Sequence, residues 1–428
     1  MKKILSFFVI LLLLFVISCG DSDPSTPGSE INGGDDGGGD DGGGGYPPVP
    51  PGGGTSSGET TDPGGGNGTV NVPSPGQLTC GEWSDIKNYD FYLNLFNITD
   101  DTNIPVNQRR NGYADYIEYF GFETRYMVTV NVISGELPVG DATVELYFSN
   151  DKLFSAKTDV RGNAYLFPSY DVTGKNITLK VYSGGVLSER SLIYNAVPVQ
   201  MTLEDYAENS SVLDLMFVID TTGSMGDELR YLKSEISDVI SSISTANPGY
   251  TINLALLFYR DKNDEYVIRD FEFTTSISDQ QHNLSLQNAN GGGDFPEAVD
   301  IALTDAVNKS WNNGNATRII FHVCDAPPHS DQESQTLYYN AIKTAAQKGI
   351  RIIPVASSGI DLATEYLLRQ EAIMTGGTYI FLTDDSGIGG EHLIPTVGEY
   401  TVEYLNACMV RVVNEYLTGI ETDPIPYY

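Results

Sequence analysis

Three oxygen-bearing side chains stand at alternate positions directly after an apolar segment. The mostly apolar run 212–219 is followed by Asp220, Thr222 and Ser224. A short β-branched run is typical of a strand buried in a parallel sheet, and such sheets bind ligands beyond the carboxyl ends of their strands. One carboxylate and two hydroxyl oxygens are hard ligands of the kind that Mg²⁺ or Mn²⁺ prefers. We therefore expect part of a divalent-cation site at this turn.

Two further acids stand where a parallel sheet would bring them to the same edge. Asp325 follows the predicted strand 318–324, and Asp294 lies in the glycine-rich segment 291–297. Because Mg²⁺ needs about six ligands, we expect Asp294 and Asp325 to complete the site begun by Asp220. A second interpretation of Asp294 stays open, since an acid followed by Pro296 and Glu297 is also a helix-capping pattern.

The elements that must position these residues alternate between strands and helices. Strands are predicted at 212–219, 252–259, 267–273, 318–324, 350–355 and 378–381. Helices are predicted between them, at about 229–243, 296–309, 334–348, 361–374 and 400–416, from apolar residues at three- and four-residue steps. This alternation predicts an α/β fold with an open, mostly parallel, Rossmann-like sheet and helices on both faces.

Over residues 212–418 this pattern resembles the von Willebrand factor A domain and its metal-ion-dependent adhesion site. The first motif of that site reads Asp-x-Ser-x-Ser, and Asp220, Thr222 and Ser224 match it with Thr in place of the first Ser. The run Gly-Gly-Gly-Asp-x-Pro-Glu and the stretch 325–329 resemble the hemicentin-like and kinase-linked subset, in which Asp294 replaces the usual Thr.

The resemblance implies a protein partner that offers an acidic side chain to the metal. A structural or envelope-assembly role, with a metal that only rigidifies the loops, is the alternative. Three carboxylates would overcompensate a divalent ion, so we expect Asp294 to bind through water or to move away when a ligand carboxylate arrives.

Catalysis is not expected, although one pattern comes close to a hydrolase motif. Residues 222–226 lie one residue from a Gly-x-Ser-x-Gly nucleophile elbow, and Asp325 with His329 or His392 would complete a Ser–Asp–His order. The first glycine is missing, however, and Asp220 would repel an oxyanion. A serine hydrolase is therefore a remote alternative.

The amino-terminal segment has the pattern of an exported lipoprotein. Two lysines precede the apolar run 4–17, and Val16-Ile17-Ser18-Cys19 resembles a bacterial lipobox. The resemblance implies a signal peptide over 1–18, a lipid anchor on Cys19, and a location in the bacterial cell envelope, at the outer membrane or cell surface. Residues 19–79 are rich in Gly, Pro and Asp without Lys or Arg, so we expect a disordered tether. The net charge of -33 excludes nucleic acid as an expected partner.

Between the tether and the predicted A domain we expect two further parts. Residues 80–123 form an aromatic-rich lead-in to the next unit, and residues 124–205 alternate with period two between turn signals, which predicts a small antiparallel β-sandwich. The stretches 138–146 and 158–164 resemble the carboxypeptidase regulatory-like family, which implies a stalk or spacer with Asp159 and Gly162 in a hairpin turn.

The cysteines other than Cys19 are odd in number. Cys80, Cys324 and Cys408 remain, so at most one disulfide can form among them in an oxidising compartment. Cys324 ends an apolar run and is expected to be a buried thiol, which makes Cys80 with Cys408 the pair to test. The sequence alone does not decide whether that bond forms.

Overall fold

The computed structural model describes residues 72–97, 113–204 and 210–428. The chain divides into two units, Met1–Gly43 and Gly44–Tyr428, and every described residue belongs to the second. The predicted signal peptide, Cys19 and most of the tether lie outside the described residues, so they stay predictions. Within the described ranges, no helix is both long and apolar enough to cross a membrane.

An eight-stranded sheet carries the candidate site, in the order β12, β11, β10, β13, β14, β15, β1, β16. Its strands are β1 (Thr79–Trp83), β10 (Val212–Asp220), β11 (Thr251–Tyr259), β12 (Ile268–Thr274), β13 (Thr317–Cys324), β14 (Ile350–Ala356), β15 (Tyr379–Leu382) and β16 (Glu403–Tyr404). The five strands from β11 to β15 in that order pair in parallel, and the pairings of β12, β1 and β16 are antiparallel. The predicted mostly parallel α/β sheet is confirmed.

Helices cover both faces of this sheet. The helices are α3 (Gly226–Ala246), α4 (Ile277–Ser285), α5 (Val299–Asn308), α6 (Gln332–Lys348), α7 (Leu362–Thr375) and α8 (Leu405–Thr418). Alternate residues of β10 enter two separate buried clusters: Phe217 packs in the cluster of α3, α4 and α8, and Val218 in that of α5, α6 and α7. Because side chains alternate along a strand, β10 contributes residues to the cores on both faces of the sheet.

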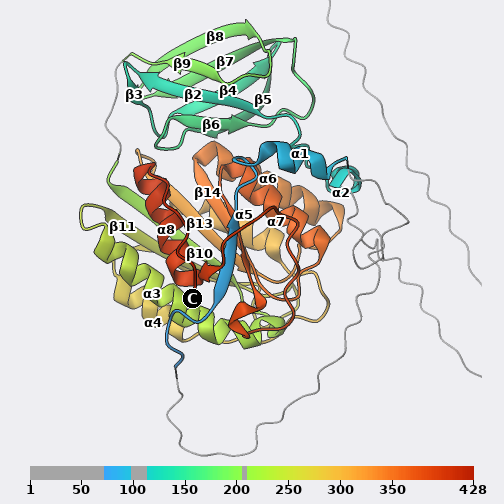
Figure 1. The fold of residues 1–428 in the computed structure, drawn as a ribbon, viewed down its shortest axis with the longest axis vertical. Helices are drawn as coiled ribbons and strands as arrows, with labels where there is room; N and C mark the ends of the chain where they lie inside the picture. The colour runs from blue at the N-terminus through green and yellow to red at the C-terminus, as the bar shows by residue number, and fades with distance from the viewer. Residues whose placement is uncertain (1–71, 98–112, 205–209) are drawn as a thin grey trace, which may run out of the picture. The chain divides into compact units, whose positions relative to one another are not determined.

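The segment before the paired small sheets differs from the expected lead-in. Residues of β1 pair with β15 on one side and β16 on the other, so β1 is a strand of the large sheet. Figure 1 shows β1 in blue beside the red helix α8. The short helices α1 (Tyr89–Leu95) and α2 (Tyr113–Phe120) follow it, and their aromatic residues pack with Tyr366 of α7.

Residues 128–202 form two four-stranded sheets. One contains β2 (Val128–Ser134), β3 (Leu137–Pro138), β6 (Asn163–Leu166) and β9 (Val199–Thr202), and the other β4 (Thr143–Phe148), β5 (Asp151–Lys157), β7 (Asn176–Ser183) and β8 (Val186–Ile193). Apolar residues of both share one buried cluster, while β2 and β9 pair in parallel. Asp159 accepts hydrogen bonds from the backbone of Arg161 and Asn163 in a turn, as predicted for that stretch.

These sheets contact the large sheet far from the candidate site. Arg318, near the start of β13, donates from Nη1 to Asp141 Oδ1 over 2.8 Å. Asp325 follows the opposite end of the same strand. The contact therefore lies at the amino-terminal edge of the parallel strands, and the carboxyl-terminal edge carries the candidate ligands.

Candidate metal centre

Asp220 ends β10, which pairs with β11 and β13 in the middle of the sheet, and its side chain is fully buried. The amide and the hydroxyl of Thr222 donate to Asp220 Oδ1 over 2.8 and 2.7 Å. The Thr222 hydroxyl lies 3.1 Å from that of Ser224, which is exposed. The predicted Asp–Thr–Ser set is therefore gathered on one turn, where it forms a single hydrogen-bonded chain.

Asp325 comes to the same place from the end of β13. Its side chain is buried, and the hydroxyl of Ser224 hydrogen-bonds to its carboxylate. Together with burial, the negative charge of Asp325 raises the pKa of Asp220, as expected for acids at the ends of neighbouring parallel strands. The structure thus joins four of the residues predicted for the site.

A glycine-rich loop closes over these two strand ends. The amide of Gly223 donates to Gly291 O over 3.1 Å, and that of Asn290 donates to Thr221 O over 3.0 Å. Gly292 has a φ of +76°, and a Cβ there would lie 2.9 Å from Glu297 Oε1 and 3.3 Å from the Cβ of Thr222. Glycine is therefore required at Gly292 both by its left-handed backbone and by this close approach.

The third carboxylate of the centre is Glu297, which the sequence interpretation did not assign to it. Its side chain is buried, and its amide donates to Pro327 O over 2.9 Å, which fixes the loop to the segment after β13. The contact with Gly292 places its carboxylate beside Thr222. A signal was present in the sequence: Glu297 directly precedes the apolar residues that begin the buried face of α5.

Asp294 occupies a different place from the one predicted for it. The residue is exposed, and within the described part of the chain no hydrogen bond or ion pair joins it to Asp220, Thr222 or Asp325. It is not the cap of α5 either, because that helix begins at Val299 with Ala298 as its N-cap. The structure therefore gives the inner position to Glu297 because the loop turns at its glycines and buries only its last residue.

The centre contains three buried carboxylate oxygens without a hydrogen-bond partner in the described residues: Asp220 Oδ2, Glu297 Oε2 and Asp325 Oδ1. Burial, reinforced by the charge of Asp220, raises the pKa of Glu297 to about 9. Burial and the charge of Asp325 likewise raise the pKa of Asp220. Unpartnered buried polar atoms cost about 1–3 kcal/mol each, and more when charged. A divalent cation would satisfy these oxygens and offset their repulsion, so the donor set fits a hard metal ion.

The carboxylate groups surround the site but do not converge on one point. Within the ranges that the structure describes, no three Asp, Glu, His or Cys side chains are arranged as a ready metal-binding group. The hydroxyls of Thr222 and Ser224 belong to the proposed donor set, and a cation would have to bring the acid side chains inward. The backbone bonds between the loops hold their main chains together for that step.

A second layer of acids, which the motifs did not point to, lies around the glycine loop. Asp264 Oδ2 accepts from the amide of Gly292 over 2.7 Å, and the charges of Asp261 and Asp264 both raise the pKa of Glu297 after its burial. His329 Nε2 lies 2.7 Å from Asp261 Oδ1. Both acids follow β11, so they are brought to the same edge as the site.

The remote hydrolase arrangement is not assembled in the described structure. His329 bonds to Asp261, while His392 lies between Glu228 and Asp384 at 3.1 and 2.7 Å. The Ser224 hydroxyl interacts instead with Thr222 and Asp325. A serine nucleophile needs a base within hydrogen-bond reach, and neither histidine meets Ser224 in that way.

The fold of this region agrees with a von Willebrand factor A domain. Residues 214–384 match that family, so the chain contains such a domain and the candidate centre lies within it. A protein of Acanthamoeba polyphaga mimivirus, named as an ariadne-like RING finger protein, is 31% identical over 137 residues, 32% of this chain. The alpha-protein kinase vwkA of Dictyostelium discoideum is 28% identical over 124 residues, 29% of this chain. The matches cover only 13% and 20% of these relatives' lengths, so they concern the domain and not the whole proteins.

Two solved bacterial structures are also similar to this chain. The conserved hypothetical protein BatB of Bacteroides thetaiotaomicron has a TM-score of 0.35 at 13% identity, covering 48% of this chain and 98% of that one. An aerotolerance-related membrane protein of Bacteroides fragilis has a TM-score of 0.32 at 12% identity, with the same coverage of 48% and 98%.

Proposed function

We propose that this chain is a lipid-anchored protein of the bacterial cell envelope whose A domain binds Mg²⁺ or Mn²⁺ and, through that cation, a partner protein. The observation that carries the metal is the set of three buried, unpartnered carboxylate oxygens contributed by three separate loops. An ordinary loop acid is either solvated or hydrogen-bonded, and these oxygens are neither.

The proposed ligands are Asp220, Thr222, Ser224, Glu297 and Asp325. The cation would supply positive charge that the protein lacks at this point, and it would accept an oxygen of a partner at an open coordination position. Ser224 is exposed on this side of the site, whereas Asp220 and Thr222 are buried beneath it. A ligand can therefore approach from the side of Ser224.

The partner group we propose is an acidic side chain, with Glu297 setting how strongly it binds. Three carboxylates exceed the charge of a divalent ion, so an entering carboxylate is repelled unless one of them withdraws or binds through water. The backbone of Glu297 is fixed at Pro327 while its Oε2 atom is unpartnered. The role first given to Asp294 thus passes to Glu297.

Metal binding can be tested by isothermal titration of the chelator-treated full chain with Mn²⁺ or Mg²⁺. We expect saturable binding that Asp220→Ala abolishes and Glu297→Gln weakens at least tenfold. Asp294→Asn is the matched control, since it removes an exposed acid of the same loop, and its affinity should stay within about twofold of the wild type, as for distant surface changes. Equal losses in Glu297→Gln and Asp294→Asn would overturn the assignment.

Partner binding requires a separate measurement. Envelope and host extracts are passed over the immobilised full chain with Mg²⁺ or with chelator. We expect a protein captured only with Mg²⁺, lost in Asp220→Ala and retained more strongly in Glu297→Gln at saturating metal. If metal raises the unfolding temperature but no metal-dependent partner is captured, the structural role of the metal replaces adhesion. Activity that is lost in Ser224→Ala and survives chelation would instead favour the hydrolase.

The anchor is tested independently of the metal. We expect labelled palmitate to enter the wild-type chain and not Cys19→Ser, and Cys19→Ser to move from the membrane to the soluble fraction. A Cys19→Ser chain that keeps its membrane association would overturn the lipid anchor without touching the metal site.

A further inference from the structure

Cys80 lies in the middle of β1, with a strand on each side. It pairs with Leu382 of β15 and with Glu403 of β16. The chain passes from β16 directly into α8, which carries Cys408 in its first turns. The register of β1 therefore places Cys80 at the level where α8 begins.

Cys80 and Cys408 face the same core. Both are fully buried and belong to the cluster that contains Leu405 and Met409 of α8, whereas Cys324 lies in the cluster on the other face of the sheet. Both are free thiols in this structure, and the interaction with Cys80 together with burial raises the pKa of Cys408. Cys324 is thus separated by the sheet from the only two cysteines that meet in the described structure.

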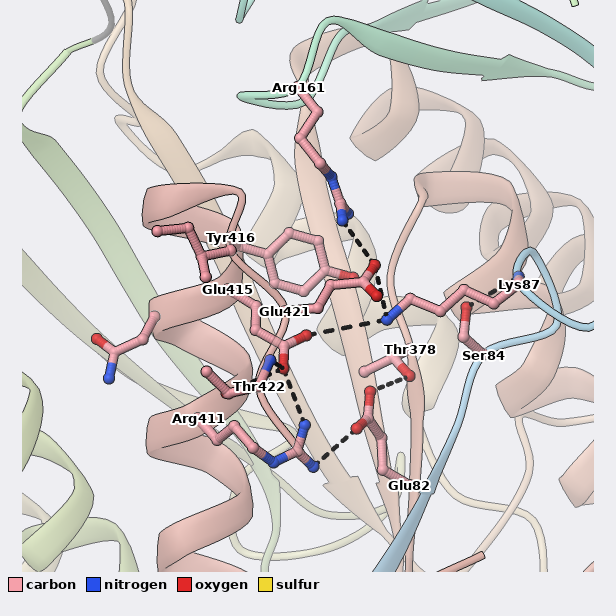
Figure 2. A network of polar contacts seen from close by, with 12 residues as sticks. Glu82, Ser84, Lys87, Arg161, Thr378, Arg411, Glu415, Tyr416, Glu421 and Thr422 are labelled. Carbon is pink, nitrogen blue, oxygen red and sulfur yellow. Dashed lines mark hydrogen bonds and ion pairs between the residues drawn. The ribbon is translucent and has the colours of Figure 1, made fainter. Parts of the chain in front are cut away.

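A polar network on the same elements holds β1 against α8 beside this pair. Arg411 Nη2 donates to Glu82 Oε2 over 2.8 Å and lies 3.7 Å from Cys408 Sγ. Arg411 also pairs with Glu403 of β16. Figure 2 shows the guanidinium of Arg411 on α8 reaching Glu82 on β1, and Thr378 bonded to Glu82. These contacts hold β1 against α8, so the two cysteines stay close to each other in the folded domain.

We propose that Cys80 and Cys408 form a disulfide that fastens β1, the first strand of the sheet, to α8, its last helix. The inference rests on the proposed export, because such bonds persist in an oxidising compartment. The two thiols lose two protons and two electrons and form one S–S bond. A disulfide oxidant, such as a thiol–disulfide oxidoreductase or oxidised glutathione, accepts the electrons and protons, and its own S–S bond breaks to give two thiols.

The bond would have a mechanical consequence. The predicted tether precedes β1, so any force on the anchor would reach the A domain through β1. Without a covalent link, β1 is held by strand pairing and by side chains such as Glu82. With the link, β1 cannot leave the sheet unless α8 moves with it. The disulfide would join the first strand and the last helix of the domain at the end where the tether attaches.

The test uses the full chain carrying Cys19→Ser, which removes the thiol that lipid would modify. The protein is unfolded, refolded with reduced and oxidised glutathione, alkylated in denaturant and digested without reduction. We expect one linked peptide pair joining Cys80 to Cys408 and alkylation of Cys324 alone. Alkylation of all three, or linkage through Cys324, would overturn the proposal.

Two variants connect this chemistry to the fold. Dithiothreitol should lower the unfolding temperature of the parent and of Cys324→Ser, and should leave that of Cys80→Ser unchanged. If Cys80→Ser does not fold, the peptide map of the parent still decides the bond. Export is judged separately from the disulfide peptide map of protein isolated from the envelope. If Cys80 and Cys408 are reduced in that protein but linked after refolding in vitro, the proposed location is contradicted and the proposed pairing is not.

Discussion

Arg369 of α7 and Asp85, just after β1, form a fully buried ion pair. Arg369 Nε donates to Asp85 Oδ2 over 2.8 Å, and the Arg369 side chain has no exposed surface. Its Nη1 also donates to Tyr113 Oη over 2.9 Å and to Thr396 O over 2.6 Å. The guanidinium therefore ties the segment after β1 and the helix α2 to the A-domain core, which explains why this segment packs there.

Removing one partner of that pair should strongly destabilise the protein. In Asp85→Ala the Arg369 charge stays buried without its main counter-ion and keeps only Glu365, whose Oε1 lies 3.9 Å away, so we expect a loss of about 3–5 kcal/mol in the free energy of unfolding. Urea denaturation measures it. Lys152→Ala is the control, because Lys152 pairs with Glu145 at 3.0 Å while 46% of its own side chain is exposed. Its loss should cost no more than about 1 kcal/mol. Equal losses would show that the buried pair is not a major contact.

The acids of the candidate metal centre should destabilise the metal-free fold. Asp220→Asn keeps Oδ1 for the bonds from Thr222 and replaces the unpartnered Oδ2 with an uncharged donor. In chelator we expect the variant to be more stable than the wild type by about 1–3 kcal/mol, the cost of an unpartnered buried polar atom. In excess Mg²⁺ the order should reverse, because only the wild type gains binding energy. Urea denaturation in both buffers tests this, and a variant less stable than wild type in chelator would contradict it.

The strands of the A domain could be predicted because their signal is local. The run 212–219 is apolar except for Asp214, and the structure extends it by one residue to Asp220. The place of β1 could not be predicted, because Cys80 and Glu82 pair with Leu382 and Ile380, far along the chain. Such pairing depends on which sheet edge is free, and a short strand of five residues, four of them buried, does not record that.

The candidate site shows the same division between local and distant information. Asp220, Thr222 and Ser224 meet on one short turn, so their spacing in the sequence was enough to predict that they lie together. The choice between Asp294 and Glu297 depends on the turn of the glycine loop and on the bond from Glu297 to Pro327. Both acids fit the chemistry of a divalent ion, and only the backbone path decides which one is buried.

Gly377 should be intolerant of any side chain. A Cβ there would lie 2.0 Å from the carbonyl oxygen of Ile352 in β14, which is backbone and cannot turn aside. We expect Gly377→Ala to lose about 3 kcal/mol or more in the free energy of unfolding, at the upper end of overpacking costs. Gly249→Ala is the matched control, since nothing lies within 4 Å of its Cβ position, and its stability should change by less than about 1 kcal/mol. Similar midpoints in urea for both variants would contradict the expected clash.

His392 should make stability depend on pH. Its Nδ1 lies 2.7 Å from Asp384 Oδ1 and its Nε2 lies 3.1 Å from Glu228 Oε1. Burial lowers the pKa of His392, but the hydrogen bonds to Glu228 and Asp384 outweigh it and raise the pKa above the ordinary value. A histidine with a raised folded-state pKa stabilises the fold when protonated. This stabilisation is fully present below the unfolded-state value of about 6.5 and is lost as pH rises through the folded-state pKa.

His392→Gln should therefore cost most at mildly acidic pH. Near pH 6 we expect a loss of about 1.5–3 kcal/mol, the range for hydrogen bonds to charged groups, and a clearly smaller loss near pH 9. Urea denaturation at the two pH values measures the difference. His282→Gln is the control, because His282 is exposed near the end of α4. A penalty in His392→Gln that stays constant or grows with pH would mean that the neutral imidazole makes these contacts, and the charged bridge from Glu228 to Asp384 would have to be abandoned.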